Sequence, residues 1–456
     1  MSARQNLFVN FSNKLFFRRL QLKDQFVGSV TIDEFDKKKK LVINPDTYEI
    51  FDLLDQKVTI GQCADMLAKR YDLDKAGVIK TVNRILEEFI DNGMISLQDS
   101  PPAGETPKVP DCLRLNHHFS LDAVAVNLLA KCNLKCLHCY GESGITRKEK
   151  LAKETVFSII DQLKELHCSE INFTGGEVFL YQDLFDILAY ARRKNFKVAL
   201  MTNGTLVTPG IVKRLKKIGH MEIQVSIDGT TAEIHDLFRG VKGSFKKSMR
   251  ALKMLKEAGF SMDINFVAHK KNCDSLPAMH NLADGIGTKL SVDPLIRLGN
   301  AVRHLDDFYI EPDIYYDVYR KLRKNRSSLG NDSANNKGKK NRPEKYIERC
   351  SAGATSIAIK ANGDVLPCEI FPQIDKFIMG NIYKTSLEEI VYNFDREKRI
   401  ADFNALNLKK CKNCELIAEC AGGCMVVAYV ESGSFNELDP FTCARFRALN
   451  GIEKQN

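Results

Sequence analysis

From about residue 121 the hydrophobic pattern switches between two periods. Short apolar runs alternate with longer stretches whose apolar positions recur at helical spacing. The predicted strands lie near 123–129, 170–174, 197–202, 222–227, 262–268 and 289–295, and the predicted helices near 150–167, 181–195, 208–218, 243–258 and 274–285. Strand–helix alternation predicts a parallel sheet with right-handed crossovers. Because six such units are too few for a closed eight-stranded barrel, we expect an α/β fold with a partial (β/α)6 barrel over 121–310.

The first hundred residues follow a different pattern. Residues 14–35 alternate as strands do, and Met94–Leu97 predicts one more strand. Three helical stretches lie between them, near 46–55, 60–70 and 74–92, and Thr59 stands where the second begins. A small sheet with three helices predicts a winged-helix-like domain over 1–100.

Two further stretches separate the domains. Residues 101–120 form a proline-rich linker or bridge, and 311–345 form a helix followed by a polar, basic linker. A separate cysteine-rich domain is expected over 346–456.

Composition narrows the class of protein. The chain has 456 residues, a net charge of +9 and 14 cysteines. No run is long and apolar enough to span a membrane, and the N-terminus lacks a signal-peptide pattern, so we expect a cytoplasmic protein without a membrane partner. In that compartment cysteines indicate metal binding more than disulfides.

The sequence from Cys132 to Cys139 places three cysteines in a C-x3-C-x2-C spacing after the first predicted barrel strand. Three thiolates leave one corner of a four-ligand site open. This loop resembles the cluster loop of the radical S-adenosylmethionine (radical SAM) enzymes. The resemblance implies that Cys132, Cys136 and Cys139 hold a [4Fe–4S] cluster whose fourth iron is chelated by SAM.

Polar motifs follow the next three predicted strands. They are Thr174–Glu177, Thr202–Gly204 and Ser226–Gly229. Each motif alone is compatible with an ordinary turn, but the carboxyl ends of parallel strands meet at one edge of a barrel, where active sites lie. Their order behind the cysteine loop strengthens the resemblance.

The resemblance also implies SAM contacts. Gly175, Gly176 and Glu177 match the turn that binds the methionine amino group, and Ser226 and Asp228 match positions that bind the ribose. Arg239 matches an arginine that contacts the SAM carboxylate, and Asn203 lies beside these residues. His138 stands where many family members have an aromatic residue, and the adenine contacts stay unassigned.

Seven more cysteines follow the second linker, and their order matches the SPASM domain of peptide-modifying radical SAM enzymes. The resemblance implies two auxiliary [4Fe–4S] clusters. Ligands carried over for the first are Cys350, Cys368 and Cys424, and those for the second are Cys411, Cys414, Cys420 and Cys443. The first set lacks a fourth ligand. Either Cys112 supplies it, or an open iron site remains where a substrate cysteine binds.

Three cysteines have no ligand role in this scheme. Cys63 lies on the apolar side of a helix, which is typical of a core residue, and Cys168 and Cys273 are structural or free thiols.

The N-terminal pattern is similar to the RiPP recognition element, which captures the leader of a precursor peptide as an added strand. The three modules together resemble a radical SAM/SPASM maturase of ribosomally made peptides. They imply SAM and three clusters as cofactors, a precursor peptide as substrate, and a flavodoxin or ferredoxin as electron donor. Thioether formation by hydrogen abstraction with a 5′-deoxyadenosyl radical is the first expectation.

Other functions remain open. Within the class, the alternatives are a carbon–carbon or carbon–oxygen crosslinking cyclase and a sulfatase-maturing oxidase. From another class comes an iron–sulfur-sensing DNA-binding regulator. The third N-terminal helix presents acids among its basic residues, a poor face for phosphates, so we expect no nucleic-acid partner. These acids are Glu87, Glu88 and Asp91.

Overall fold

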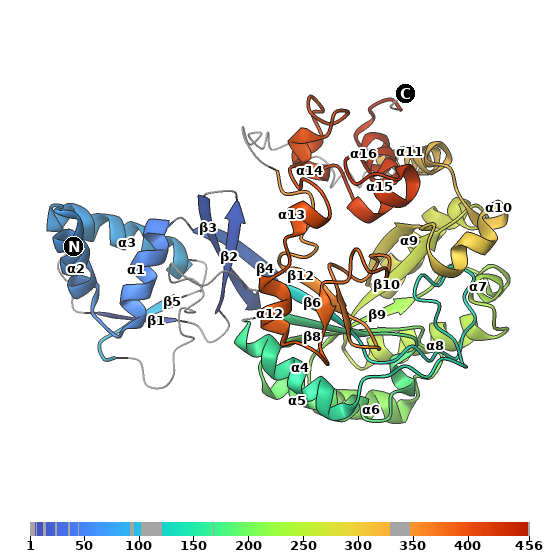
Figure 1. The fold of residues 1–456 in the computed structure, drawn as a ribbon, viewed down its shortest axis with the longest axis horizontal. Helices are drawn as coiled ribbons and strands as arrows, with labels where there is room; N and C mark the ends of the chain where they lie inside the picture. Colours follow the sequence, from blue (N-terminus) through green and yellow to red (C-terminus); the bar gives the residue numbers. More distant parts are fainter. Residues whose placement is uncertain are drawn as a thin grey trace. The chain divides into compact units, whose positions relative to one another are not determined.

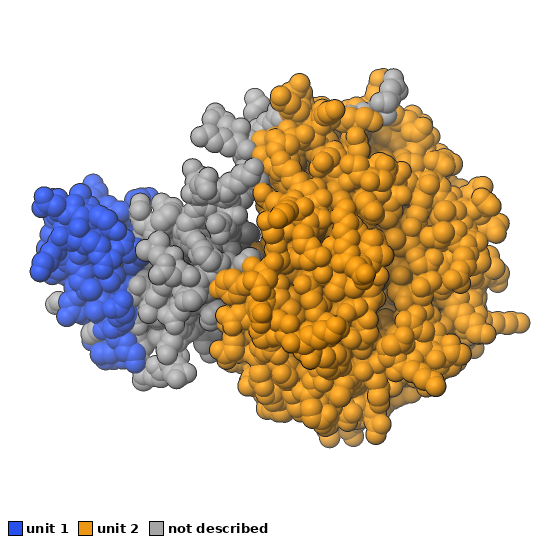
Figure 2. Space-filling view, in the orientation of Figure 1, with its two compact units in different colours: residues 1–122 blue, residues 123–456 orange. Residues whose placement is uncertain are grey.

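The computed structural model describes residues 5, 7–11, 15–22, 25–34, 37–43, 45–91, 95–101, 121–166, 168–328 and 347–454. The chain divides into two compact units, Met1–Asp122 and Ala123–Asn456, which Figure 2 colours separately. None of the described helices is long and apolar enough to cross a membrane.

The first unit holds the small sheets and three helices of the N-terminal region. Strands β1 (Phe8–Phe11) and β5 (Ile95–Gln98) pair antiparallel, with Val9 opposite Leu97. A second, antiparallel sheet consists of β2 (Leu15–Leu22), β3 (Gln25–Glu34) and β4 (Lys37–Ile43). The helices are α1 (Pro45–Asp55), α2 (Ile60–Tyr71) and α3 (Lys75–Asp91).

Helix α2 begins where the sequence predicts. The Thr59 hydroxyl accepts a hydrogen bond from the Gln62 backbone N–H at 3.2 Å, and the Gln62 side chain accepts one from the Thr59 backbone at 2.8 Å. The three helices bury one apolar cluster that includes Phe51, Leu86 and the thiol of Cys63. The predicted core position of Cys63 is therefore confirmed.

The second unit contains the predicted parallel sheet. Its six strands are β6 (Ala123–Asn127), β7 (Glu170–Thr174), β8 (Lys197–Thr202), β9 (Glu222–Ser226), β10 (Ser261–Ala268) and β11 (Lys289–Pro294). They pair in sequence order and all in parallel. The predicted α/β class with a mainly parallel sheet is thus confirmed.

Helices cover the outside of this sheet. They are α4 (Lys153–Glu165), α5 (Leu184–Arg193), α6 (Pro209–Ile218), α7 (Ala232–Arg239), α8 (Ser244–Glu257) and α9 (Leu276–Ile286). Figure 1 shows α4, α5 and α6 side by side along it. Helix α7, which carries Arg239 in its last turn, was not among the predicted helices because it spans only eight residues.

The sheet continues into the cysteine-rich tail. Strand β12 (Ser356–Ile359) pairs in parallel with β6, and β13 (Asp364–Leu366) and β14 (Gly380–Asn381) extend the sheet antiparallel. The nine-stranded order is β11-β10-β9-β8-β7-β6-β12-β13-β14. The sequence predicted a separate tail domain and missed this extension, because β12 and β13 are only four and three residues long.

The remaining helices lie in the connection and the tail. They are α10 (Leu305–Phe308), α11 (Pro312–Ser328), α12 (Leu387–Tyr392), α13 (Arg396–Arg399), α14 (Ile417–Cys420), α15 (Met425–Ser432) and α16 (Pro440–Asn450). Helix α11 lies where a helix was predicted within 311–345, whereas residues 102–120 and 329–346 of the predicted connections lie outside the described residues.

Candidate functional site

The cysteine loop follows β6 and is held on both sides by backbone hydrogen bonds. The Cys132 N–H donates to the Gly144 carbonyl at 3.2 Å. On the other side, the N–H groups of Lys135 and Leu137 donate to carbonyls at the end of α7, at 3.1 and 3.0 Å. The loop is therefore fixed between the segment that follows it and helix α7.

This loop brings its three cysteines, the barrel group, together. Cys132 and Cys136 are buried, Cys139 is partly buried, and all three are free thiols. Burial raises the pKa of Cys136 to about 12, and the charges of Cys132 and Cys139 add to this effect. Ionising these thiols without a bound cation would therefore be costly. A cluster of soft thiolates of this kind fits an iron–sulfur group.

The glycine turn after β7 packs directly on the loop. A Cβ on Gly176 would stand 2.1 Å from the Lys131 carbonyl oxygen, and one on Gly175, whose φ is +136°, 2.4 Å from the Leu129 oxygen. The Gly176 N–H donates to that same Leu129 oxygen at 2.7 Å. Both glycines are required because no side chain fits between turn and loop.

Glu177 is completely buried rather than exposed to the cavity. Its carboxylate accepts hydrogen bonds from the Thr202 hydroxyl at 2.7 Å and the Asn203 N–H at 2.8 Å. Burial raises its pKa, and these hydrogen bonds oppose that rise. The carboxylate ties the turn after β7 to the end of β8, and its contact with the methionine amino group of SAM stays a prediction.

Asp228 is also completely buried, against Arg239. One carboxylate oxygen accepts from the Val267 N–H at 3.0 Å, and the other lies 2.5 Å from Arg239 Nε. Burial alone would raise the pKa of Asp228, but the Arg239 charge outweighs it and the pKa falls to about 2. Both oxygens face protein groups, so Asp228 orients Arg239 in this structure, and its direct contact with the SAM ribose stays a prediction.

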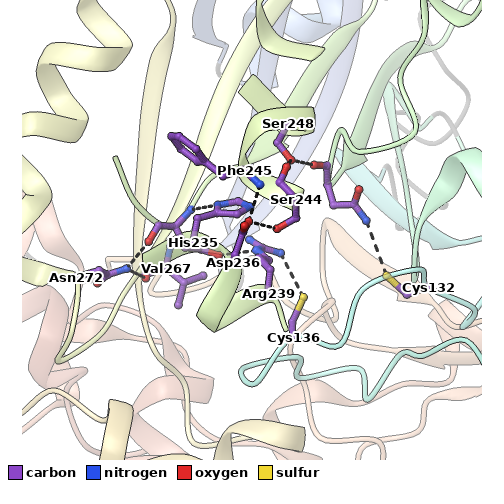
Figure 3. A network of polar contacts seen from close by, with 12 residues as sticks. Cys132, Cys136, His235, Asp236, Arg239, Ser244, Phe245, Ser248, Val267 and Asn272 are labelled. Atoms are coloured by element: carbon purple, nitrogen blue, oxygen red, sulfur yellow. Dashed lines mark hydrogen bonds and ion pairs between the residues drawn. The ribbon is translucent and has the colours of Figure 1, made fainter. Parts of the chain in front are cut away.

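Two polar side chains approach the thiols themselves. Arg239 Nη1 donates to Cys136 Sγ at 3.7 Å, as Figure 3 shows. Asn203 Nδ2 donates to Cys132 Sγ at 3.9 Å and to the Asn133 side chain at 3.0 Å. Residue Asn203 therefore fixes the loop, a role that the sequence did not predict.

A cavity of about 420 Å³ opens beside the barrel group. Its lining includes all three thiols, Gly175, Gly176, Ser226 and Arg239. Every parallel strand contributes at least one lining residue, among them Asn127, Thr174, Met201, Gln224, Asn265 and Asp293. The predicted convergence of the strand-end motifs on one site is seen here, apart from the buried Glu177 and Asp228.

The tail closes one side of this cavity with Glu369, the residue after Cys368. Its carboxylate accepts from Asn127 Nδ2 at 2.7 Å, from the Tyr140 hydroxyl at 2.9 Å, and from Lys360 Nζ at 3.3 Å. The sequence analysis missed Glu369 and Lys360, although adjacency to a ligating cysteine was an available signal.

Three of the tail cysteines, the first tail group, lie together in an apolar cluster. They are Cys350, Cys368 and Cys424. Burial raises the pKa of Cys368, and the charges of the other two raise it further. The proposed fourth ligand, Cys112, lies outside the described residues.

The other four tail cysteines form the second tail group. They are Cys411, Cys414, Cys420 and Cys443, and all four line one small hollow of about 20 Å³. Burial raises the pKa of Cys411 to about 12, and the other three thiols contribute. Cys168 and Cys273 lie apart, with their thiols directed at the carbonyls of Glu170 and Lys270.

Arg349 lies between the two tail groups and is buried. Its guanidinium donates to the carbonyls of Gly422, Gly423, Phe435 and Glu437. Its charge acts on Cys350 and Cys424 of the first group and on Cys411 of the second. Among the described residues, no three His, Cys, Asp or Glu side chains surround a single point closely enough to hold one metal ion.

Comparisons with known proteins agree with this arrangement. The profile of the Radical SAM superfamily matches residues 126–283, and that of the SPASM iron–sulfur cluster-binding domain matches 350–415. Mycofactocin maturase MftC of Mycolicibacterium smegmatis is 30% identical over 331 residues, which are 71% of this chain and 83% of that protein. An AdoMet-dependent heme synthase of Methanosarcina barkeri is 29% identical over 344 residues, 71% of this chain and 96% of that protein.

A solved structure resembles nearly the whole chain. Streptococcus suis SuiB bound to S-adenosylmethionine gives a TM-score of 0.65 at 18% identity, over 95% of this chain and 99% of that one. At this identity the likeness shows the fold alone. A second SuiB structure holds its precursor peptide SuiA.

Proposed function

Because the chain belongs to the radical SAM superfamily and carries a SPASM domain, we propose that it modifies a ribosomally made precursor peptide by forming thioether crosslinks. The observation that carries the proposal is the shared cavity. Thiols of the barrel group and Glu369 of the tail bound the same space of about 420 Å³, which is within the size range of a small-molecule site and brings the tail next to the thiols.

The residues present fit SAM and a cluster at the barrel group. Cys132, Cys136 and Cys139 would hold three irons, and the two tail groups would hold two auxiliary clusters. When bound, the cluster and SAM supply a 5′-deoxyadenosyl radical that removes a hydrogen atom from the substrate. Cys112 or a substrate cysteine would complete the first tail group.

The protein's own residues would bind SAM and orient the peptide. Gly175 and Gly176 would present the backbone of their turn to the methionine end of SAM, and Ser226 would bind the ribose; all three line the cavity. Arg239, held by Asp228, presents its guanidinium to the cavity for the SAM carboxylate. Glu369 and Lys360 face the substrate side, where they would orient peptide groups and exclude water.

The N-terminal unit is proposed to bind the leader of the precursor, as a RiPP recognition element does. The fold likeness to SuiB extends over 95% of this chain and so includes most of this unit. The sequence matches to MftC and to the heme synthase each cover 71% of the chain, so they do not separate the two substrates. The fold likeness to SuiB, a structure of which holds its precursor peptide, supports a peptide.

Anaerobic reconstitution tests the proposal. We expect about twelve irons per chain, 5′-deoxyadenosine from SAM, and a peptide lighter by two hydrogen atoms whose fragmentation places the new bond at a cysteine sulfur. A carbon–carbon or carbon–oxygen bond, or an oxidised cysteine without a crosslink, would replace the thioether assignment. Turnover of an iron porphyrin instead of a peptide would identify a heme synthase, and a DNA shift without SAM cleavage would identify a regulator.

A further inference from the structure

A second, basic hollow lies beside the cysteine loop. It has a volume of about 610 Å³. Its cationic lining residues are Lys131, Arg147, Lys148, Lys150 and Lys153. Exposed Ile145 lies among them. We call this surface the basic hollow.

Three of these cations are available to a partner. Arg147 pairs with Glu149, and Lys153 pairs with Asp183 and Asp186. In contrast, Lys131, Lys148 and Lys150 are exposed and make no ion pair with any residue that the structure describes. Exposed, uncompensated lysines on one concave surface attract an acidic partner.

The basic hollow is closely connected to the thiols. Lys131 precedes Cys132 in the chain, and the Cys132 N–H donates to the Gly144 carbonyl at 3.2 Å. The Ser143 N–H donates to Cys139 Sγ at 3.3 Å. Ser143 and Gly144 directly precede the lining segment that begins at Ile145, so this segment, the wall of the hollow, is tied by hydrogen bonds to the backbone of Cys132 and to the thiol of Cys139.

The substrate cavity lies on the other side of this wall. Leu129, Arg147 and Glu149 line both spaces, while the thiols line the cavity alone. With SAM and a peptide in the cavity, an electron carrier must approach from another face. The basic hollow offers such a face, since its lining residue Lys131 is the chain neighbour of Cys132.

We propose that the basic hollow is the docking surface for an acidic, low-potential electron-transfer protein of the flavin or iron–sulfur class. The inference rests on the proposed radical SAM function. In the encounter the reduced carrier would lose one electron, and the iron–sulfur group that Cys132, Cys136 and Cys139 would hold would gain it. No bond is made or broken. Electrostatic complementarity sets the encounter rate of such complexes and makes it sensitive to salt.

The test compares two reductants in the reconstituted enzyme. The double variant Lys148→Glu/Lys150→Glu reverses two free charges without touching a thiol or the SAM site. With reduced flavodoxin we expect SAM cleavage to slow about tenfold at low salt, and the difference to shrink as salt rises. With dithionite, which needs no docking, the rate should equal that of the wild type.

A matched control is Lys216→Glu/Lys217→Glu, two exposed lysines at the end of α6. It should behave as the wild type with both reductants. Direct binding of flavodoxin, measured by calorimetry, should weaken about tenfold in the first variant and not in the control.

Other outcomes overturn the inference. An equal loss in both variants would mean that only net charge matters, and a loss with dithionite would mean that Lys148 and Lys150 support the loop itself. Weaker peptide binding with normal flavodoxin binding would assign the basic hollow to the peptide. If the wild type fails to cleave SAM with dithionite, the proposed function fails, while the calorimetric comparison still decides whether flavodoxin docks here.

Discussion

The barrel group and the second tail group are both sets of buried thiols, yet they differ in what surrounds them. The barrel group opens on a cavity of about 420 Å³, and the second tail group lines a hollow of about 20 Å³. Three thiols face the large space and four face the small one. An incomplete ligand set with room beside it suits a cofactor that binds and leaves, whereas a complete set suits a group that stays.

Arginine is used differently in the two regions. Arg239 pairs with Asp228 and reaches the open cavity and a thiol. Arg349 donates instead to four backbone carbonyls of the tail. The Arg239 guanidinium is available to a ligand, whereas the Arg349 guanidinium stabilises the fold of the tail.

The largest expected effect follows from removing one thiol in each region. Cys136→Ala should abolish 5′-deoxyadenosine formation, a loss of about a thousandfold or more, because the group that cleaves SAM loses a ligand. Cys420→Ala should lose about four irons and still cleave SAM. Iron analysis and chromatography of the nucleoside measure both. Loss of SAM cleavage in Cys420→Ala would contradict the expectation that only the barrel group is needed for this reaction.

Replacing the two arginines is the next test. Arg349→Gln leaves buried carbonyls without donors, so we expect the free energy of unfolding to fall by about 3–5 kcal/mol. Arg239→Gln should chiefly weaken SAM binding. Urea denaturation and SAM calorimetry measure the two effects, with Arg250→Gln on the exposed face of α8 as control. Equal stability of Arg349→Gln and the control would show that Arg349 does not fasten the tail.

A smaller change alters the contact between turn and loop. Gly176→Ala places a Cβ 2.1 Å from the Lys131 oxygen, so the loop must shift, and we expect reduced iron content and SAM affinity, with about 1–3 kcal/mol lost in stability. Gly285→Ala in α9, where nothing lies within 4 Å of the added Cβ, is the matched control and should be neutral or slightly stabilising. Unchanged SAM binding in Gly176→Ala would contradict the close packing.

The barrel and the tail should differ in how acid affects their stability, because residues 347–456 contain no histidine. Burial lowers the pKa of His269 and of His235 to about 4, from the usual 6.5. Between pH 6.5 and 4 the unfolded chain binds protons that the folded barrel does not, so stability falls as the pH falls through this window.

Each of these buried histidines should contribute on the order of 3 kcal/mol to the free energy of unfolding above pH 6.5. This contribution is fully lost near pH 4. In His269→Gln the free energy of unfolding, measured by urea denaturation, should fall between pH 6.5 and 4 by about 3 kcal/mol less than in the wild type. An unchanged slope in this variant would show that His269 titrates normally in the folded protein.

The sequence predicted the parallel sheet well, because each barrel strand is a short apolar run between amphipathic helices. The convergence of the cysteine loop with Gly175 and Ser226 followed from strand polarity, whereas Arg239, on the unpredicted helix α7, was assigned from the family resemblance. The sequence could not predict which carboxylates face the cavity. Glu177 and Asp228 are buried because Thr202, Asn203, Val267 and Arg239 happen to surround them, and those contacts join distant segments.

The tail was less predictable than the barrel. Its cysteine order indicated two groups of thiols, and the members of each lie together; their role as cluster ligands stays a prediction. The role of Arg349 and the position of Glu369 depend on turns of the tail, whose elements are short. No periodic pattern identifies a strand as short as β13, since three residues show no alternation.

The parallel pairing of β12 with β6 has a consequence for how the protein is made. Ala123 of β6 pairs with Glu170 on one side and with Ser356 on the other. During synthesis the first neighbour emerges early, whereas the second emerges only after the whole barrel and the following linker. Until then one edge of β6 stays open, and open strand edges recruit other chains. A ribosome that stalls before residue 356 would therefore release a barrel prone to aggregate, and the rate of folding should depend on this late closure.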